Sequence, residues 1–166
     1  MSEIKMQYAA SVALTISPAS LATDANHLAG VEADAFDNSS NEYLGALMAG
    51  KVTTGTTPTT GKEIRLYVVG IMEDSTWPDV FDGTASAETV TSSGIRDSIC
   101  KLAAVMATDA TSDRTYFFGP VDIPSLFGGI MPKKVTAFIT HNTGVNLNST
   151  GSNHAIYLTP YTQQIV

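Results

Sequence analysis

The stretch from Asp113 to Tyr161 contains three short apolar runs of the kind that form β-strands. The runs cover residues 115–121, 135–141 and 155–161, and loops rich in Gly, Pro, Thr, Asn and Ser join them. Strands this short do not stay folded alone, because a lone hairpin is marginal in water and needs another layer over its apolar face. The earlier part of the chain must therefore supply that layer.

The earlier sequence offers four more strand-like runs, at residues 4–16, 31–36, 43–54 and 62–71. The last is the clearest, because apolar residues alternate along it and both of its faces are apolar in its second half, as in the middle of a sheet. Small residues in the third run predict close approach of another backbone, or a bulge at Gly50.

Residues 93–108 fit two patterns. Ile99, Leu102 and Met106 recur at helical spacing, but alternate residues from Ile99 to Ala107 would also share one face of a strand. We favour a strand, because the surrounding segments are all of β type. The sequence then predicts an all-β chain of seven or eight strands with long loops, folded as one antiparallel, jelly-roll-like β-sandwich over residues 1–166, with residues 1–5 as a flexible arm.

Charge narrows the possible partners. Charged residues make up 15% of the chain and its net charge is −7, so we expect no binding to nucleic acid or to anionic membranes, which depends on clustered Lys and Arg. The start of the chain does not resemble a signal peptide, and no apolar run is long enough to span a membrane. We expect synthesis in the cytoplasm.

No pattern in the chain specifies catalysis. His141 and His154 flank one loop and would lie close together if strands 135–141 and 155–161 paired, but zinc needs three or four ligands, and no third is evident. Asp residues bunch in three loops without the spacing of a calcium loop, as expected of turn formers. Cys100 lies in an apolar run, where a thiol is unreactive. We predict no enzyme activity, no metal and no cofactor.

Large apolar residues occur in several presumed loops. They either plug the ends of the sandwich or contact another chain, and the low charge of the protein favours the second role. We therefore predict contacts with other subunits or with a larger assembly at Trp77, Phe81, Phe127 and Met131, and at the 142–153 loop with its flanking residues, namely His141, Asn142, Asn146, Asn148, Asn153 and His154.

Three segments carry a resemblance to a known family. They read NEYLGALMAGKVTTGTTPTTGKEIRLYVVGIMED, TWPDVFDGTASAETVTSSGIR and SDRTYFFGPVDIPSLFGGIMPKKVTAFITHNTGVNLNSTGSNHAIYLTPY, within residues 36–161. This succession resembles the capsid decoration, or cement, proteins of tailed bacteriophages. The resemblance implies a non-enzymatic virion protein that forms a homotrimer, binds the major capsid protein on the outer surface of the assembled capsid, and stabilises the shell. No catalytic residue carries over.

Two other functions stay open. One is a carbohydrate-binding or receptor-binding module of a phage tail or fibre, for which Trp77 and Asp79 are the candidate residues. The other is a small hydrolase, which would need carboxylates converging in a cleft.

Overall fold

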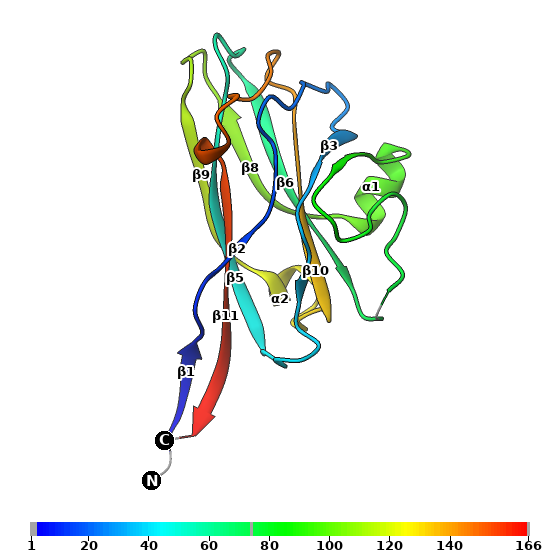
Figure 1. Ribbon diagram of the computed structural model, residues 1–166, viewed down its shortest axis with the longest axis vertical. Coiled ribbons are helices and arrows are strands. Elements are labelled where there is room, and N and C mark those ends of the chain that lie inside the picture. The colour runs from blue at the N-terminus through cyan, green and yellow to red at the C-terminus, as the bar shows by residue number, and fades with distance from the viewer. Residues whose placement is uncertain (1–2, 74, 166) are drawn as a thin grey trace.

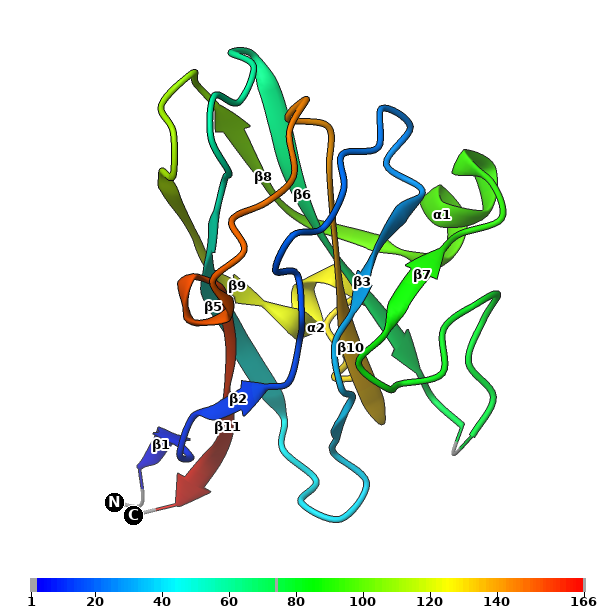
Figure 2. The ribbon, with the colours of Figure 1, turned by 45° about the horizontal axis from the view of Figure 1, so that its top comes forward.

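The computed structural model describes residues 3–73 and 75–165, which form two antiparallel sheets packed face to face (Figure 1, Figure 2). Sheet A has the order β1-β11-β5-β9, with β2 also on β11, and sheet B has the order β7-β3-β10-β6-β8, with β4 also on β10. This confirms the predicted all-β sandwich. The elements are β1 (Ile4–Tyr8), β2 (Val12–Leu14), β3 (Ala29–Glu32), β4 (Phe36–Asp37), β5 (Gly45–Thr53), β6 (Lys62–Ile71), β7 (Ala87–Thr89), α1 (Ser93–Ile99), β8 (Lys101–Thr108), β9 (Thr115–Asp122), α2 (Ile123–Leu126), β10 (Lys134–His141), η1 (Gly151–Asn153) and β11 (Ala155–Ile165).

The strand pairs are nested within one another along the chain. Strand β2 pairs with β11, β3 with β10, β5 with β9, and β6 with β8. The partners Leu14 and Ile156, and likewise Leu66 and Ala104, have the same midpoint, near residue 85. The chain is thus arranged as one long hairpin whose two arms are rolled across both sheets. The pairs β11–β5 and β10–β6 complete the two sheets.

The core lies between the sheets and is apolar. Every other residue of the central strands points inward, so Met48, Leu66, Ile139 and Leu158 are fully buried there. The strong alternation in residues 62–71 therefore identified β6 correctly, including its place between two neighbours.

Residues 93–108 form a helix followed by a strand, so our prediction of a strand was right for β8 and wrong for α1. Ser92 starts the helix, because its Oγ accepts a hydrogen bond from the Ile95 N–H at 3.3 Å. Arg96 then fixes it to the body of the protein by donating from Nη1 to the Asn26 carbonyl at 2.7 Å. Seven helical residues leave little periodicity to detect.

The outer face of sheet B is covered by the chain itself. Helix α1 and residues 75–90 lie over it and enclose a second apolar cluster of Tyr67, Val69, Phe81, Val90, Cys100 and Phe138. The ring of Phe81 packs edge-on against Phe138, with centroids 5.4 Å apart. Buried Glu32 holds this cover in place by accepting hydrogen bonds from the Gly83 N–H at 2.8 Å and the Asp82 N–H at 3.2 Å.

Residues 4–8 and 161–165 pair as a narrow ribbon that leaves the body of the sandwich (Figure 1). Ile4 pairs with Ile165 and Tyr8 with Tyr161, whereas β5 pairs with β11 only as far as Tyr161. Residues 4 and 5, predicted to belong to a flexible arm, are therefore in a strand, and residues 1 and 2 of that arm lie outside the described residues. Within the described ranges, no helix has the length and apolar character needed to cross a bilayer.

Candidate functional site

The outer face of sheet A is open and apolar in its centre. Strand alternation points Phe117 of β9 and Tyr157 of β11 outward, and their side chains are 75% and 49% exposed. Between them lies Ala49, which pairs with Tyr157. Since a soluble chain rarely leaves clustered large apolar groups in water without a use for them, this face is a candidate for binding another molecule.

A shallow hollow of about 360 Å³ lies on this face, and we call it the slot. It is lined by Ala49, Gly50, Lys51, Phe117, Phe118, Gly119 and Tyr157. Gly119 has a φ of +84°, and a Cβ there would lie 2.4 Å from the Met48 carbonyl oxygen, so only glycine fits. The lack of side-chain bulk at Gly119 and Ala49 leaves open space among the aromatic rings.

This face carries almost no charge. Among the outward positions of β5, β9 and β11, the charged residues are Lys51 and Asp122. Asp122 is already bonded, because the Tyr161 hydroxyl donates to its Oδ1 at 2.8 Å. Burial, together with Asp122, raises the pKa of Tyr161 to about 12, so this hydroxyl keeps its proton. The face is neutral in a chain whose net charge is −7.

The ribbon formed by β1 and residues 161–165 of β11, which we call the terminal ribbon, extends this face. Ile4, Met6 and Tyr8 share one side with Tyr161, Gln163 and Ile165, and the side chains of Ile4, Met6, Tyr8 and Ile165 are all more than half exposed. The opposite side carries Lys5, Gln7, Thr162 and Gln164. Because residues 157, 159, 161, 163 and 165 lie on one face of β11, the apolar side continues the outer face of sheet A.

A second apolar depression, of about 610 Å³, lies beside helix α1. Its lining includes Ile71, Met72, Trp77 and Phe127, with Lys101 among the polar residues. Trp77 and Phe127, two of the predicted contact residues, therefore lie at an accessible surface. Asp79 is not part of this lining. Its carboxylate accepts hydrogen bonds from the backbone N–H of Thr91 at 3.0 Å and from the Thr91 hydroxyl at 2.6 Å.

Four of the predicted contact residues are buried inside their own chain. Phe81 and Met131 are 4% and 8% exposed; Met131 packs in the core between the sheets and Phe81 in the cluster over the outer face of sheet B, so neither side chain faces a partner. His141 and His154 are also buried. They order loops: His141 Nε2 lies 3.0 Å from the Leu21 carbonyl oxygen, and His154 Nε2 lies 2.9 Å from that of Asn148. The prediction that these four make contacts is wrong for this reason.

The asparagines of the 142–153 loop are mostly engaged with each other or with neighbouring loops. Asn142 accepts from the Glu63 N–H at 2.8 Å, Asn153 donates to Asn148 at 3.0 Å, and Asn148 donates to Asp113 at 2.7 Å. Asn146 is exposed and lines a polar hollow of about 350 Å³ at this end of the sandwich. Strands β10 and β11 lie in different sheets, so the two histidines that flank the loop are not on paired strands.

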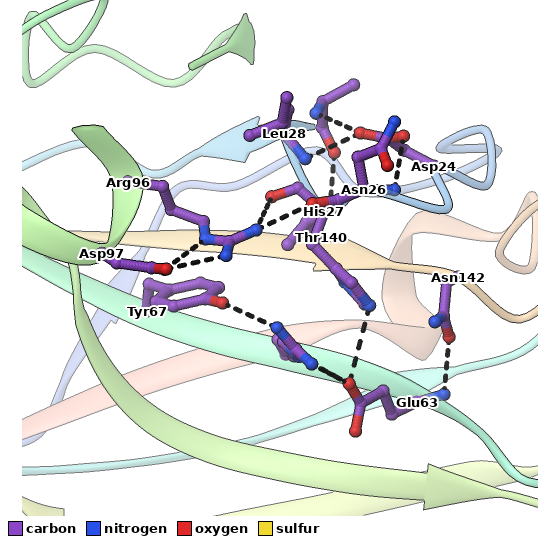
Figure 3. Close-up of polar contacts among 12 residues, drawn as sticks. Asp24, Asn26, His27, Leu28, Glu63, Tyr67, Arg96, Asp97, Thr140 and Asn142 are labelled. Atoms are coloured by element: carbon purple, nitrogen blue, oxygen red, sulfur yellow. Dashed lines mark hydrogen bonds and ion pairs between the residues drawn. The ribbon is translucent and has the colours of Figure 1, made fainter. Parts of the chain in front are cut away.

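A cluster of titratable groups lies around His27, on the outer side of sheet B (Figure 3). The ring points toward Glu63, with Nε2 3.6 Å from Oε1, and both ring nitrogens are buried without a hydrogen bond. Burial lowers the pKa of His27 to about 4. Arg65 pairs with Glu63, and Arg96 pairs with Asp97, so the cations are neutralised within the cluster.

Arg96 links this cluster to the outer face of sheet B. The guanidinium of Arg96 lies 5.6 Å from the centre of the Tyr67 ring and joins α1 to sheet B. Burial raises the pKa of the nearby Cys100 thiol to about 12, which keeps it from acting as a nucleophile. The parts of the chain that the structure describes contain no group of three or more His, Cys, Asp or Glu side chains able to hold a metal ion.

Comparison of the chain with protein-family models, with curated proteins and with solved structures finds no match in any of the three. The open face of sheet A is thus identified by its own geometry. Sequence reasoning missed it, although the adjacent Phe117 and Phe118 were a usable sign: in a strand, one of two neighbours must point outward.

Proposed function

We propose that this chain is a non-enzymatic structural protein of a phage particle, a decoration or cement protein that binds the outer surface of the assembled capsid and stabilises it. It acts as a homotrimer, and its partner on the shell is the major capsid protein. The observation that carries the proposal is the neutral, exposed apolar face of sheet A, because such a surface serves lasting contact between proteins. The resemblance in residues 36–161 specifies the kind of assembly.

The topology supports the same proposal. We interpret the nested strand pairs as a jelly roll, an architecture found in viral capsid and lectin domains. Many copies on one particle also gain strength from repeated contacts, so each contact needs only modest affinity. We assign the shell contact to the end of the sandwich that carries Asn146 and the 142–153 loop.

Reconstitution tests the proposal. Purified chain is added to phage particles that lack it, and bound copies are counted before the particles are heated until their DNA escapes. We expect binding to saturate at a fixed number of copies per shell and to raise the temperature of DNA release. Absence of the chain from purified particles, with an unchanged release temperature, would sink the proposal.

The second candidate is a carbohydrate-binding module of a tail or fibre. The partly buried Trp77 at the 610 Å³ depression favours it, because sugars stack on such rings. In a glycan-binding assay, this function predicts a signal that Trp77→Ala removes and Phe117→Ala leaves intact. No binding to any glycan would leave the structural role as the better account.

A further inference from the structure

We propose that copies of this chain associate head to tail, with the apolar side of one copy's terminal ribbon lying in the slot of the next copy. The occupant of the slot is thus a second copy of the same chain. This inference concerns surfaces of the isolated protein, and it holds whether or not the final assembly is a phage shell.

The terminal ribbon lacks the layer that would stabilise it. All five residues of β1 are exposed, and two strands without a covering layer are marginally stable in water. Beyond Tyr161, the edge of β11 that faces β5 is also unpaired, so residues 162–165 present open backbone groups there. Exposed edges of this kind pair readily with another chain. We therefore expect the terminal ribbon to be covered by another chain.

The slot offers a matching surface. It is apolar, it lies between the exposed rings of Phe117 and Tyr157, and its volume of about 360 Å³ admits a large apolar side chain. Met6 and Tyr8 are such side chains, and both project from the ribbon. A large anchor residue in an apolar pocket is the usual source of binding energy at protein interfaces.

The ribbon cannot reach the slot of its own copy. The slot lies over β5, β9 and β11 in the body of sheet A, whereas the ribbon is the continuation of that same sheet and runs away from the body (Figure 1). The two surfaces can meet only between molecules. A contact between two different surfaces of one chain is repeated from copy to copy and closes into a ring if the rotation permits, as a trimer requires.

The low charge of both surfaces also fits a second copy of the chain as the partner. Copies with a net charge of −7 repel one another, so they approach best through faces that carry no excess of carboxylates. The ribbon meets this condition, since Glu3 and Lys5 form an ion pair at 3.2 Å, and the slot carries only Lys51. Asp122 also lies on this face of sheet A, where its carboxylate accepts a hydrogen bond from the Tyr161 hydroxyl at 2.8 Å. It and Lys51 are the charged outward residues of β5, β9 and β11.

A matched pair of isoleucines tests the inference by sedimentation velocity of the purified chain. Ile4 of the ribbon and Ile130 of the α2–β10 loop are 68% and 63% exposed, so glutamate at either position disturbs the fold equally little. We expect Ile4→Glu to weaken self-association by at least about tenfold, and Ile130→Glu to leave it unchanged. A wild-type chain that is monomeric at about 100 µM, or equal behaviour of the two variants, would overturn the inference.

Mixing two defective variants tests the head-to-tail geometry. Ile4→Glu damages the ribbon and Phe117→Glu damages the slot, so each variant alone should be monomeric. Their mixture retains one intact ribbon and one intact slot, and we expect it to form dimers and nothing larger. A mixture that stays monomeric contradicts the inference.

The same variants separate this inference from the proposed function. A chain that self-associates in this way but leaves phage particles undecorated keeps the inference and loses the proposed function. If both variants still self-associate but no longer bind shells, the surface belongs to a shell protein and the inference is wrong.

Discussion

His27 is buried in a left-handed backbone conformation, with a φ of 55°. Burial, followed by the charge of Arg65, lowers its pKa from 6.5 to about 4, so the ring is neutral in the folded protein. In the unfolded chain, the imidazole of His27 binds a proton below pH 6.5. His27 therefore stabilises the fold fully above that pH, and its contribution is lost as the pH falls from about 6.5 to 4, by up to about 3 kcal/mol.

His27→Asn should remove this pH dependence, because asparagine tolerates the left-handed conformation and does not titrate. We expect the variant to be less stable at pH 7, since the smaller side chain leaves a gap, but to lose less of its remaining stability between pH 6.5 and 4. Urea unfolding at several pH values measures this. If the free energy of unfolding of the variant depends on pH as steeply as that of the wild type, His27 is not the group responsible for the loss of stability in acid.

Glu32 has the opposite effect to His27 on the pH dependence of stability, over an overlapping range of pH. Burial raises the pKa of this carboxyl from 4.5 to about 7, even though the Gly83 and Asp82 N–H groups favour its charged form. The folded protein thus holds a proton that the unfolded chain releases, and stability falls as the pH rises from 4.5 to 7.

Glu32→Gln should abolish the fall in stability between pH 4.5 and 7, which is on the order of 3 kcal/mol. It should also make the loss of stability below pH 6.5, which arises from the histidines, steeper. Thermal melts across pH 4.5 to 8 provide the check, with Glu42→Gln at an exposed carboxyl as the control. If the two variants give the same pH profile, Glu32 is not buried as a neutral acid.

At the scale of the element, local alternation predicted most strands, because β6, β9, β10 and β11 carry apolar residues at every second position. Local pattern was insufficient where a short element depends on tertiary contacts. Helix α1 rests on the cap at Ser92 and on the contacts of Arg96 with the 26–27 loop, which lies about seventy residues away in the chain.

The small residues in the run 43–54 were predicted to mark close approach of another backbone or a bulge at Gly50, and both features are present at Gly50. The β5–β9 register shifts between Met48 and Gly50, and a Cβ on Gly50 would lie 2.2 Å from the Ala155 carbonyl oxygen. We expect Gly50→Ala to destabilise the protein by roughly 1–3 kcal/mol, as overpacking does. Gly151→Ala, where no atom lies within 4 Å of the added carbon, should cost far less in chemical denaturation. Equal losses would contradict this packing.

At the scale of the whole molecule, the sequence predicted a sandwich but not which of its faces is open. Apolar residues at Phe81 and Met131 looked available for contacts, yet they fill the chain's own clusters. The open surface comprises Phe117, Tyr157 and the terminal ribbon, and strand pairing between distant residues places them on one face of sheet A. No local pattern contains that information.

The central claim is that the terminal ribbon and the slot are a contact surface, and amide hydrogen exchange tests it most directly. The backbone amides of residues 4–8 and 162–165 are followed at concentrations below and above the onset of self-association. We predict rapid exchange in the dilute protein and protection of these amides by at least about a hundredfold in the concentrated one. Exchange at the same fast rate under both conditions would contradict the account.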